Sequence, residues 1–219
     1  NFGVKGTMTE KAEEKQYRCP GESYTISDSV CRGRQRVNYP KCNVCLEKVE
    51  PGGFAQSHSE PKLSINIFKS YDIRGKYPSE LNDTTAHKIG TSIALFFREK
   101  NPDVKNIVVG RDMRLSSKSL ANALIEGLCT AGLNVINVGV VSSEMTYFAV
   151  GHYKYDGGVM VTASHNPAEY NGFKLCREQA IPVSFETGID RISKLTKQYH
   201  PLRGEHLGKV IVSDIFVDY

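Results

Sequence analysis

From residue 65 onward, apolar positions switch between short continuous runs and helical spacing. Continuous runs bounded by turn residues predict strands at 65–68, 106–110, 133–138, 158–161 and 173–176. Amphipathic spacing predicts helices at 83–100, 117–131, 143–153 and 185–199, with Asp83 as the cap of the first. In that helix Ile89, Ile93, Phe96 and Phe97 share one face, so we assign them to the core.

The order of these elements predicts the sheet. Strands separated by a helix are expected to pair in parallel, whereas the strand at 173–176 follows after a short loop and is expected to be antiparallel. The fold class is therefore α/β, with a mixed, mostly parallel sheet flanked by helices.

The remaining segments lack this pattern. We interpret residues 1–15 as a tag remnant or disordered tail, 16–46 as a small Cys-rich segment and 47–62 as a linker containing Pro51 and Gly52. One α/β domain is expected at 63–207. Residues 208–219 are expected to start a second domain.

Composition adds few constraints. The chain of 219 residues has 24% charged and 40% hydrophobic residues and a formal net charge of +4, which are values of an ordinary soluble protein. The basic residues are scattered, so no nucleic-acid partner is expected. No apolar run approaches the length of a membrane span, and the N-terminus has no apolar signal core. We expect a cytoplasmic protein without a membrane partner.

Cysteines concentrate near the N-terminus. Cys42 and Cys45 form a C-x-x-C loop that can place two thiolates on one metal ion, and Cys19 and Cys31 could complete a Cys₄ zinc site. One C-x-x-C pair does not secure this geometry, so reduced unpaired thiols and an iron–sulfur cluster stay open as alternatives. Cys129 and Cys176 fall in predicted core elements, and we interpret them as small buried apolar residues.

The stretch 157–177 carries the candidate chemistry. A buried strand ends in a small-residue loop with Ser164, His165 and Asn166, and a second strand carrying Lys174 follows. Pro167 cannot join a sheet ladder, so Ser164 should lie just beyond the strand end, where open α/β sheets bind ligands. On its own this loop could equally be a hydrophilic turn.

Two other stretches favour a functional interpretation. Residues 68–75 (FKSYDIRG) and 108–117 (VVGRDMRLSS), together with 162–174, closely resemble the α-D-phosphohexomutases, in particular the phosphomannomutase/phosphoglucomutase branch. The resemblance runs in order from about residue 65 to Tyr219 and leaves out the first sixty or so residues. It implies that 63–207 is the first domain of that family.

The resemblance also implies roles for individual residues. Ser164 would be a phosphoserine whose phosphate ligates Mg²⁺, and Arg74 and Arg111, both placed in loops after strands, would steady that phosphate. Arg111 beside Asp112 could equally form a local ion pair. Lys174 is the first choice of general base and His165 the second, because the attacking sugar hydroxyl must lose a proton. Tyr71 would contact the substrate, and the Asn166 side chain would hold the loop.

The implied reaction interconverts hexose 1-phosphate and hexose 6-phosphate through a hexose 1,6-bisphosphate. The residues at 69–72 favour a glucose or mannose phosphate. The family's aspartate-rich metal loop, sugar-recognition loop and phosphate-anchoring domain have no counterpart in this sequence, so the chain is expected to fold but not to turn over. The alternative is a zinc-binding interaction module fused to a non-catalytic mutase-like domain.

Overall fold

The computed structural model describes residues 16–17, 26–27, 65–200 and 207–219. The chain divides into two compact units, Asn1–Glu60 and Pro61–Tyr219, which are taken separately. In the first unit, β1 (Gln16–Tyr17) pairs antiparallel with β2 (Ile26–Ser27). The predicted tail, the linker and the four N-terminal cysteines of the predicted zinc site lie outside the described residues.

The second unit is built on one six-stranded sheet. Its strands are β3 (Ile73–Lys76), β4 (Asn106–Arg111), β5 (Asn134–Val140), β6 (Gly157–Val161), β7 (Tyr170–Arg177) and β8 (Val210–Val212). They lie in the order β3-β7-β6-β4-β5-β8. β4 pairs in parallel with β5 and β6, and β5 with β8, while β7 runs antiparallel to β6 and β3. The predicted mixed, mostly parallel sheet is confirmed.

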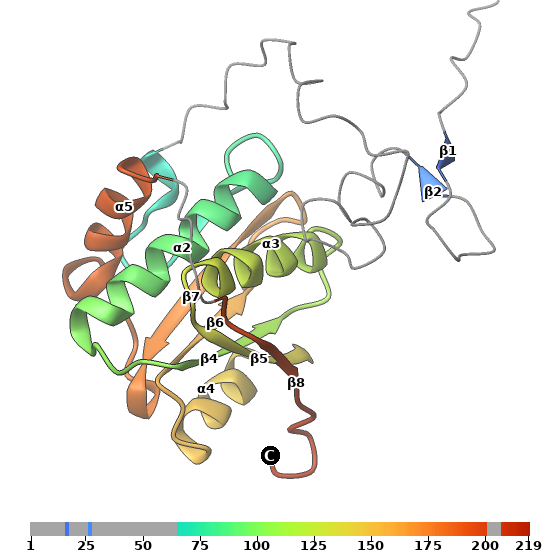
Figure 1. The fold of residues 1–219 in the computed structure, drawn as a ribbon. Helices are drawn as coiled ribbons and strands as arrows, with labels where there is room; N and C mark the ends of the chain where they lie inside the picture. Colours follow the sequence, from blue (N-terminus) through green and yellow to red (C-terminus); the bar gives the residue numbers. More distant parts are fainter. Residues whose placement is uncertain (1–15, 18–25, 28–64, 201–206) are drawn as a thin grey trace, which may run out of the picture. The chain divides into compact units, whose positions relative to one another are not determined.

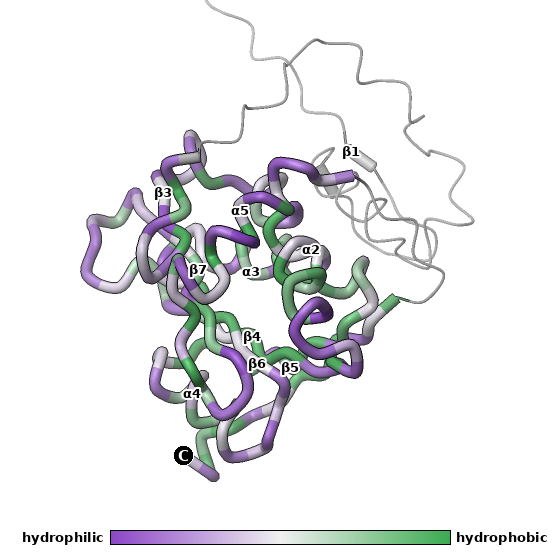
Figure 2. The backbone as a smooth tube through the Cα atoms, turned by 90° about the vertical axis from the view of Figure 1, so that its left-hand side faces the viewer, coloured by the Kyte–Doolittle hydropathy of each residue, from purple (hydrophilic) through white to green (hydrophobic). Residues whose placement is uncertain are grey.

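Helices cover both faces of this sheet (Figure 1). α2 (Asp83–Lys100), α3 (Ser117–Thr130) and α5 (Asp190–Lys197) contribute to one hydrophobic cluster, and α4 (Ser143–His152) contributes to a second. Successive side chains of a strand point to opposite faces, so Val109 joins the first cluster and Val108 the second. Hydrophobic residues accordingly run along β4 and β5, between the helical layers (Figure 2). The central strands β4 and β6 are buried on both faces, whereas the edge strand β8 is exposed.

Close approach of α2 and α3 depends on two glycines. A Cβ on Gly90 would lie 2.3 Å from the Leu124 carbonyl oxygen, and a Cβ on Gly127 would lie 2.2 Å from that of His87. Thr91 Oγ1 also donates to the Gly127 carbonyl oxygen at 3.3 Å. Gly127 is therefore a backbone contact between the two helices.

Two predicted boundaries at the start of the domain are wrong. Residues 65–68 contain a 3₁₀ turn, η2 (Ile65–Ile67), and the strand begins instead at Ile73. Ile67 and Phe68 are apolar because they pack into the core, and Phe68 makes only an isolated bridge to Ile73. Asn82, not Asp83, caps α2: its side chain accepts a hydrogen bond from the Thr85 amide at 3.0 Å.

The later part of the chain also departs from prediction. β7 begins at Tyr170, three residues before the predicted start of its strand, so that Asn171 and Gly172 lie inside it. A short turn, η3 (Glu178–Ala180), follows β7. The segment predicted as one helix at 185–199 consists of a wide helical turn, η4 (Phe185–Ile189), and then α5. The single predicted helix is not formed because the backbone of Gly188 is not helical. The stretch expected to start a second domain contributes β8 to the same sheet through its pairing with β5.

The two cysteines of this unit occupy the predicted core elements. Cys176 is fully buried and Cys129 is half-buried. Burial raises the pKa of the Cys176 thiol to about 12 and that of the Cys129 thiol to about 11. Within the described ranges, none of the helices has the length and apolarity needed to span a bilayer.

Candidate active site

The loop between β6 and β7 follows the carboxyl end of β6. Strand order decides its surroundings, because β3 flanks β7 on one side and β4 flanks β6 on the other. Ala163 is buried beneath the loop, whereas Ser164 and His165 are exposed. The Ser164 backbone lies in the left-handed region, with φ of 55°. A serine rarely adopts this conformation unless surrounding contacts hold it.

A buried hydroxyl connects the loop to the end of β4. Thr162 Oγ1 donates to Asp112 Oδ2 at 2.7 Å and accepts from the Ser164 amide at 2.9 Å. The Asp112 amide in turn donates to the Val161 carbonyl oxygen at 3.0 Å. Asp112 therefore fixes the backbone of Ser164 through one intervening side chain.

Arg114 binds the same loop through its carbonyl groups. Its Nη2 donates to the carbonyl oxygens of Ser164 and Asn166, each at 2.8 Å. Its Nη1 donates to those of Pro167 at 2.7 Å and Tyr170 at 3.2 Å. Asp112 orients the guanidinium by accepting from its Nε at 3.2 Å.

A second arginine reaches the loop from the opposite side. Arg74, on β3, donates from Nη1 to the side-chain oxygen of Asn166 and from Nε to Asp72 Oδ2 at 3.1 Å. Asp72 is buried, and its Oδ1 has no hydrogen-bond partner among the described residues. The predicted loop-holding role of Asn166 thus has a structural counterpart in its contact with Arg74.

Asn171 supports the base of the site. It is fully buried in β7, and its side-chain nitrogen donates to Ser116 Oγ at 2.8 Å and Ser117 Oγ at 2.9 Å. The Ser117 hydroxyl donates to Asp112 Oδ1. The start of α3, the end of β4 and the start of β7 are therefore joined by one polar network.

The other predicted residues lie around this loop with fewer contacts. His165 Nδ1 lies 3.5 Å from Ser164 Oγ. Tyr71 is 80% exposed immediately before β3, where it is free to meet a ligand. Arg111 ends β4 and, among the described residues, donates only to the backbone oxygen of Asp112, at 3.3 Å. The proposed Arg111–Asp112 ion pair is wrong, because the Asp112 carboxylate binds Arg114 instead.

Arg74 and Lys174 both lie in strands, as predicted for Lys174 but not for Arg74. Arg74 lies within β3 and not in a loop after a strand. Lys174 is half-buried in β7, opposite Met160 of β6. The pKa of Glu144 is lowered by hydrogen bonds to its own amide and to Ser142, and further by the charge of Lys174, so this lysine faces the first turn of α4.

The Mg²⁺ that the resemblance implies would need suitable ligands at this site. Among residues 65–200 and 207–219, no group of three or more His, Cys, Asp or Glu side chains could hold a metal ion. The carboxylate bonded to the loop, Asp112, accepts hydrogen bonds on both oxygens. The described residues therefore do not form a carboxylate cage for Mg²⁺.

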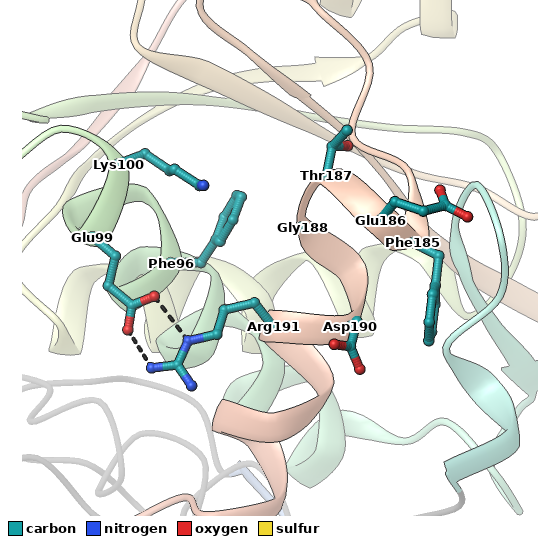
Figure 3. A pocket seen from close by; sticks show the side chains of 9 residues that line it. All are labelled: Phe96, Glu99, Lys100, Phe185, Glu186, Thr187, Gly188, Asp190 and Arg191. Carbon is teal, nitrogen blue, oxygen red and sulfur yellow. Dashed lines mark hydrogen bonds and ion pairs between the residues drawn. The ribbon is translucent and has the colours of Figure 1, made fainter.

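Two surface hollows differ in their relation to the loop. One, of about 500 Å³, opens directly beside it and is lined by Asp112, Met113, Arg114, Asn166 and Ala168. The other, of about 360 Å³, lies between the end of α2 and η4, where Arg191 Nε donates to Glu99 Oε2 at 2.9 Å (Figure 3). Of these two, the first is lined by residues of the loop that carries Ser164.

Sequence reasoning gave no role in the site to six residues of this network: Asp112, Arg114, Ser116, Ser117, Thr162 and Asn171. All six fall inside the stretches 108–117 and 162–174 that had been singled out. The sequence signal for Arg114 was its charge, close to a predicted strand end and in the same stretch as Arg111. This signal does not indicate which of the two arginines, Arg111 or Arg114, contacts the loop.

Comparisons with known proteins agree with this geometry. The family described as "Phosphoglucomutase/phosphomannomutase, alpha/beta/alpha domain I" matches residues 66–202. A phosphomannomutase of Vibrio cholerae serotype O1 is 47% identical over 134 residues, which cover 61% of this chain and 29% of that protein. A phosphomannomutase of Klebsiella pneumoniae is 42% identical over 159 residues, which cover 70% of this chain and 98% of that protein.

A solved structure shares the fold. The crystal structure of a phosphoglucomutase/phosphomannomutase family protein from Burkholderia thailandensis aligns with a TM-score of 0.63 at 31% identity, covering 72% of this chain and 35% of that one. The chain thus spans about a third or less of the length of the Vibrio and Burkholderia proteins.

Proposed function

Because the chain belongs to the phosphoglucomutase/phosphomannomutase family, we propose that it carries the phosphoserine of a hexose phosphate mutase, at Ser164. One observation carries this proposal. The Ser164 hydroxyl is exposed at a strand end, on a loop held by one arginine from each flanking strand region. A relay that must meet two different sugar hydroxyls needs this combination of access and fixed position.

The first half-reaction phosphorylates Ser164. Ser164 Oγ attacks a phosphorus of a hexose 1,6-bisphosphate, the new Oγ–P bond forms, and the P–O bond to the sugar breaks. The serine proton leaves as the bond forms, and His165 Nδ1, 3.5 Å away, can accept it in the tautomer that leaves this nitrogen unprotonated. The departing sugar oxygen takes up a proton and becomes a free hydroxyl.

The second half-reaction returns the phosphoryl group. A hydroxyl of a hexose monophosphate attacks the phosphoserine, the Oγ–P bond breaks, and Ser164 regains a proton. We assign the base for the attacking hydroxyl to Lys174 in its neutral form, with His165 as the second candidate. The position of Lys174 on the α4 side of β7 supports a contact with a sugar that lies over this face.

Positive charge is available for the phosphate. A phosphoserine carries close to two negative charges, and transfer depends mainly on positioning and charge stabilisation. The Arg74 side chain is 26% exposed, so part of its guanidinium can turn toward a phosphate while Asp72 and Asn166 hold the rest. Arg111, whose side chain makes one backbone contact among the described residues, is the second cation.

The relatives support the proposed substrate class. The similar proteins of Vibrio cholerae and Klebsiella pneumoniae are named phosphomannomutases, and a protein of Xanthomonas campestris named as a phosphohexose mutase is also 47% identical over 127 residues. We propose glucose or mannose phosphates as substrates. Tyr71, exposed beside Arg74, is the substrate contact of this proposal.

Turnover by the 219-residue chain alone is not part of the proposal. A bound Mg²⁺ would neutralise charge on the phosphoryl group, but the described residues supply no carboxylate set for it. A sugar held only at its reacting end would also lack most of the positioning contribution, worth about 7–11 kcal/mol in well-oriented reactions. We expect slow phosphorylation of Ser164 without measurable mutase turnover.

Incubation with glucose 1,6-bisphosphate, followed by intact mass and peptide mapping, tests the proposal. One phosphate is expected on Ser164 and none in the Ser164→Ala variant. Ser79→Ala, at an exposed turn residue, is the matched control and should be phosphorylated on Ser164 like the parent. Phosphate found only on another residue, or no phosphate on any residue, would contradict the assignment.

A further inference from the structure

We propose that Arg114 is a positioning residue for this reaction: it holds Ser164 in the left-handed conformation that exposes its hydroxyl. The inference rests on the proposed phosphoserine role of Ser164. It concerns a residue that acts through the loop backbone and does not touch the phosphate.

The contacts of Arg114 use its whole hydrogen-bonding capacity. A guanidinium has five N–H donors in a planar fork. Nε donates to the Asp112 carboxylate, Nη1 to the carbonyl oxygens of Pro167 and Tyr170, and Nη2 to those of Ser164 and Asn166. All five donors therefore have an acceptor, and four of the five acceptors are backbone atoms of one loop.

These acceptors enclose the reactive residue. The Ser164 carbonyl belongs to the peptide between Ser164 and His165 and the Asn166 carbonyl to the peptide before Pro167, so Arg114 fixes the plane directly after Ser164 and a second plane two residues further on. The positive φ of Ser164 costs about 1–2 kcal/mol for a residue other than glycine, so contacts must hold it. The Arg114 side chain is only 16% exposed, although its hydrogen bonds to the Ser164 and Pro167 carbonyls lie at the surface.

The charge of Arg114 is also committed. Asp112 neutralises it at 3.2 Å, and no N–H donor is left for a phosphate. Removing the guanidinium should therefore slow the phosphorylation of Ser164 without weakening the binding of the bisphosphate. Loss of a phosphate-binding arginine would instead raise the apparent KM.

Lysine is the informative replacement. Arg114→Lys keeps the charge and much of the side-chain length, but an ammonium has three donors and no planar fork. It cannot serve five acceptors at once. Arg191→Lys is the matched control, because Arg191 pairs with Glu99 in the separate hollow beside α2 and has no contact with the loop.

The experiment compares the parent chain with Arg114→Lys, Arg114→Ala and Arg191→Lys. Amide hydrogen exchange is followed at Ser164, Asn166 and Tyr170, each of which donates a hydrogen bond inside the loop. Both Arg114 variants should exchange at least about tenfold faster at these amides, since several charge-assisted hydrogen bonds are lost. Amides in the core of β4 and the Arg191→Lys chain should show parent-like exchange.

The rate at which glucose 1,6-bisphosphate phosphorylates Ser164 is the second readout. The maximal rate should fall at least tenfold in Arg114→Lys with an unchanged apparent KM. Unchanged loop exchange, a rise in KM alone, or loss of cooperative unfolding in both Arg114 variants would each overturn the assignment. If the parent chain takes no phosphate, the proposed function fails, while the exchange data still decide whether Arg114 orders the loop.

Discussion

The hydroxyl of Thr162 donates a 2.7 Å hydrogen bond to the carboxylate of Asp112, 50 residues earlier in the chain. The same oxygen accepts from the Ser164 amide at 2.9 Å. A carboxylate at the end of β4 thereby determines the backbone of a serine beyond the end of β6. The exposed serine and the buried network beneath it form one structural unit.

Replacing Thr162 by Val tests this connection. The change keeps the shape but leaves the Ser164 amide without its acceptor and removes one donor from Asp112. We expect the free energy of unfolding in urea to fall by about 1–3 kcal/mol. Thr84→Val, at an exposed position near the start of α2, should change it by less than about 0.5 kcal/mol. Equal stability of the two variants would show that the Thr162 hydroxyl is not needed.

Gly172 sets the spacing between β3 and β7. A Cβ there would lie 2.2 Å from the Ile73 carbonyl oxygen and 3.1 Å from Arg74 Cα. Gly172→Ala should push β3 away, weaken the Arg74–Asn166 contact and cost about 1–3 kcal/mol of stability.

The matched control is Gly151→Ala. Gly151 lies in α4, and a Cβ there has no neighbour within 4 Å. This change should stabilise the protein by about 0.5–1 kcal/mol, because alanine favours the helix. Urea titrations of both variants provide the comparison. A neutral Gly172→Ala would mean that the two strands can separate without cost.

Cys176 makes stability depend on alkaline pH. Burial raises the pKa of its thiol from 9.0 to about 12. Below pH 9 the thiol is protonated in both the folded and the unfolded chain, so its contribution is fully present. Between pH 9 and about 12 the unfolded chain ionises first, and stability is lost as pH rises.

Cys176→Ala isolates this contribution. The variant should be less stable at about pH 8, because it loses buried volume. On moving to about pH 10.5, however, it should lose about 2 kcal/mol less stability than the parent. Titrations in urea at the two pH values measure the difference, and the other cysteines and tyrosines cancel between the two chains. Parallel pH dependences would show that this thiol does not titrate as its burial requires.

The zinc site stays a prediction, because Cys19, Cys31, Cys42 and Cys45 lie outside the described residues. Reduced protein purified without chelator should contain about one Zn²⁺ per chain by elemental analysis. Cys42→Ser should remove most of the metal, whereas Cys129→Ser, in α3, should leave it unchanged. A zinc content below about 0.2 equivalents in the parent chain would refute the prediction.

Local pattern was sufficient for the central strands, for α2, α3 and α4 and for the position of the loop, but it missed β3 and β8. The bounds of α2 match the predicted 83–100, because the spacing of Ile89, Ile93 and Phe96 is a property of the segment itself. The parallel pairing of β4 with β5 followed from the intervening helix. Pro167 and the small residues before it placed Ser164 beyond a strand end, and these constraints also act within a few residues.

The contacts that hold Ser164 were decided only by the tertiary structure. Arg114 meets the Ser164 carbonyl 50 residues away, and Arg74 meets Asn166 across 92 residues. Both contacts exist because the β6–β7 pair is inserted between β3 and β4 in the sheet. Local periodicity fixes which face of a strand a side chain occupies, but not which strand lies beside it. Strand order depends on the packing of the whole sheet, so the sequence could mark Ser164 but could not show that Arg114, and not Arg111, turns toward it.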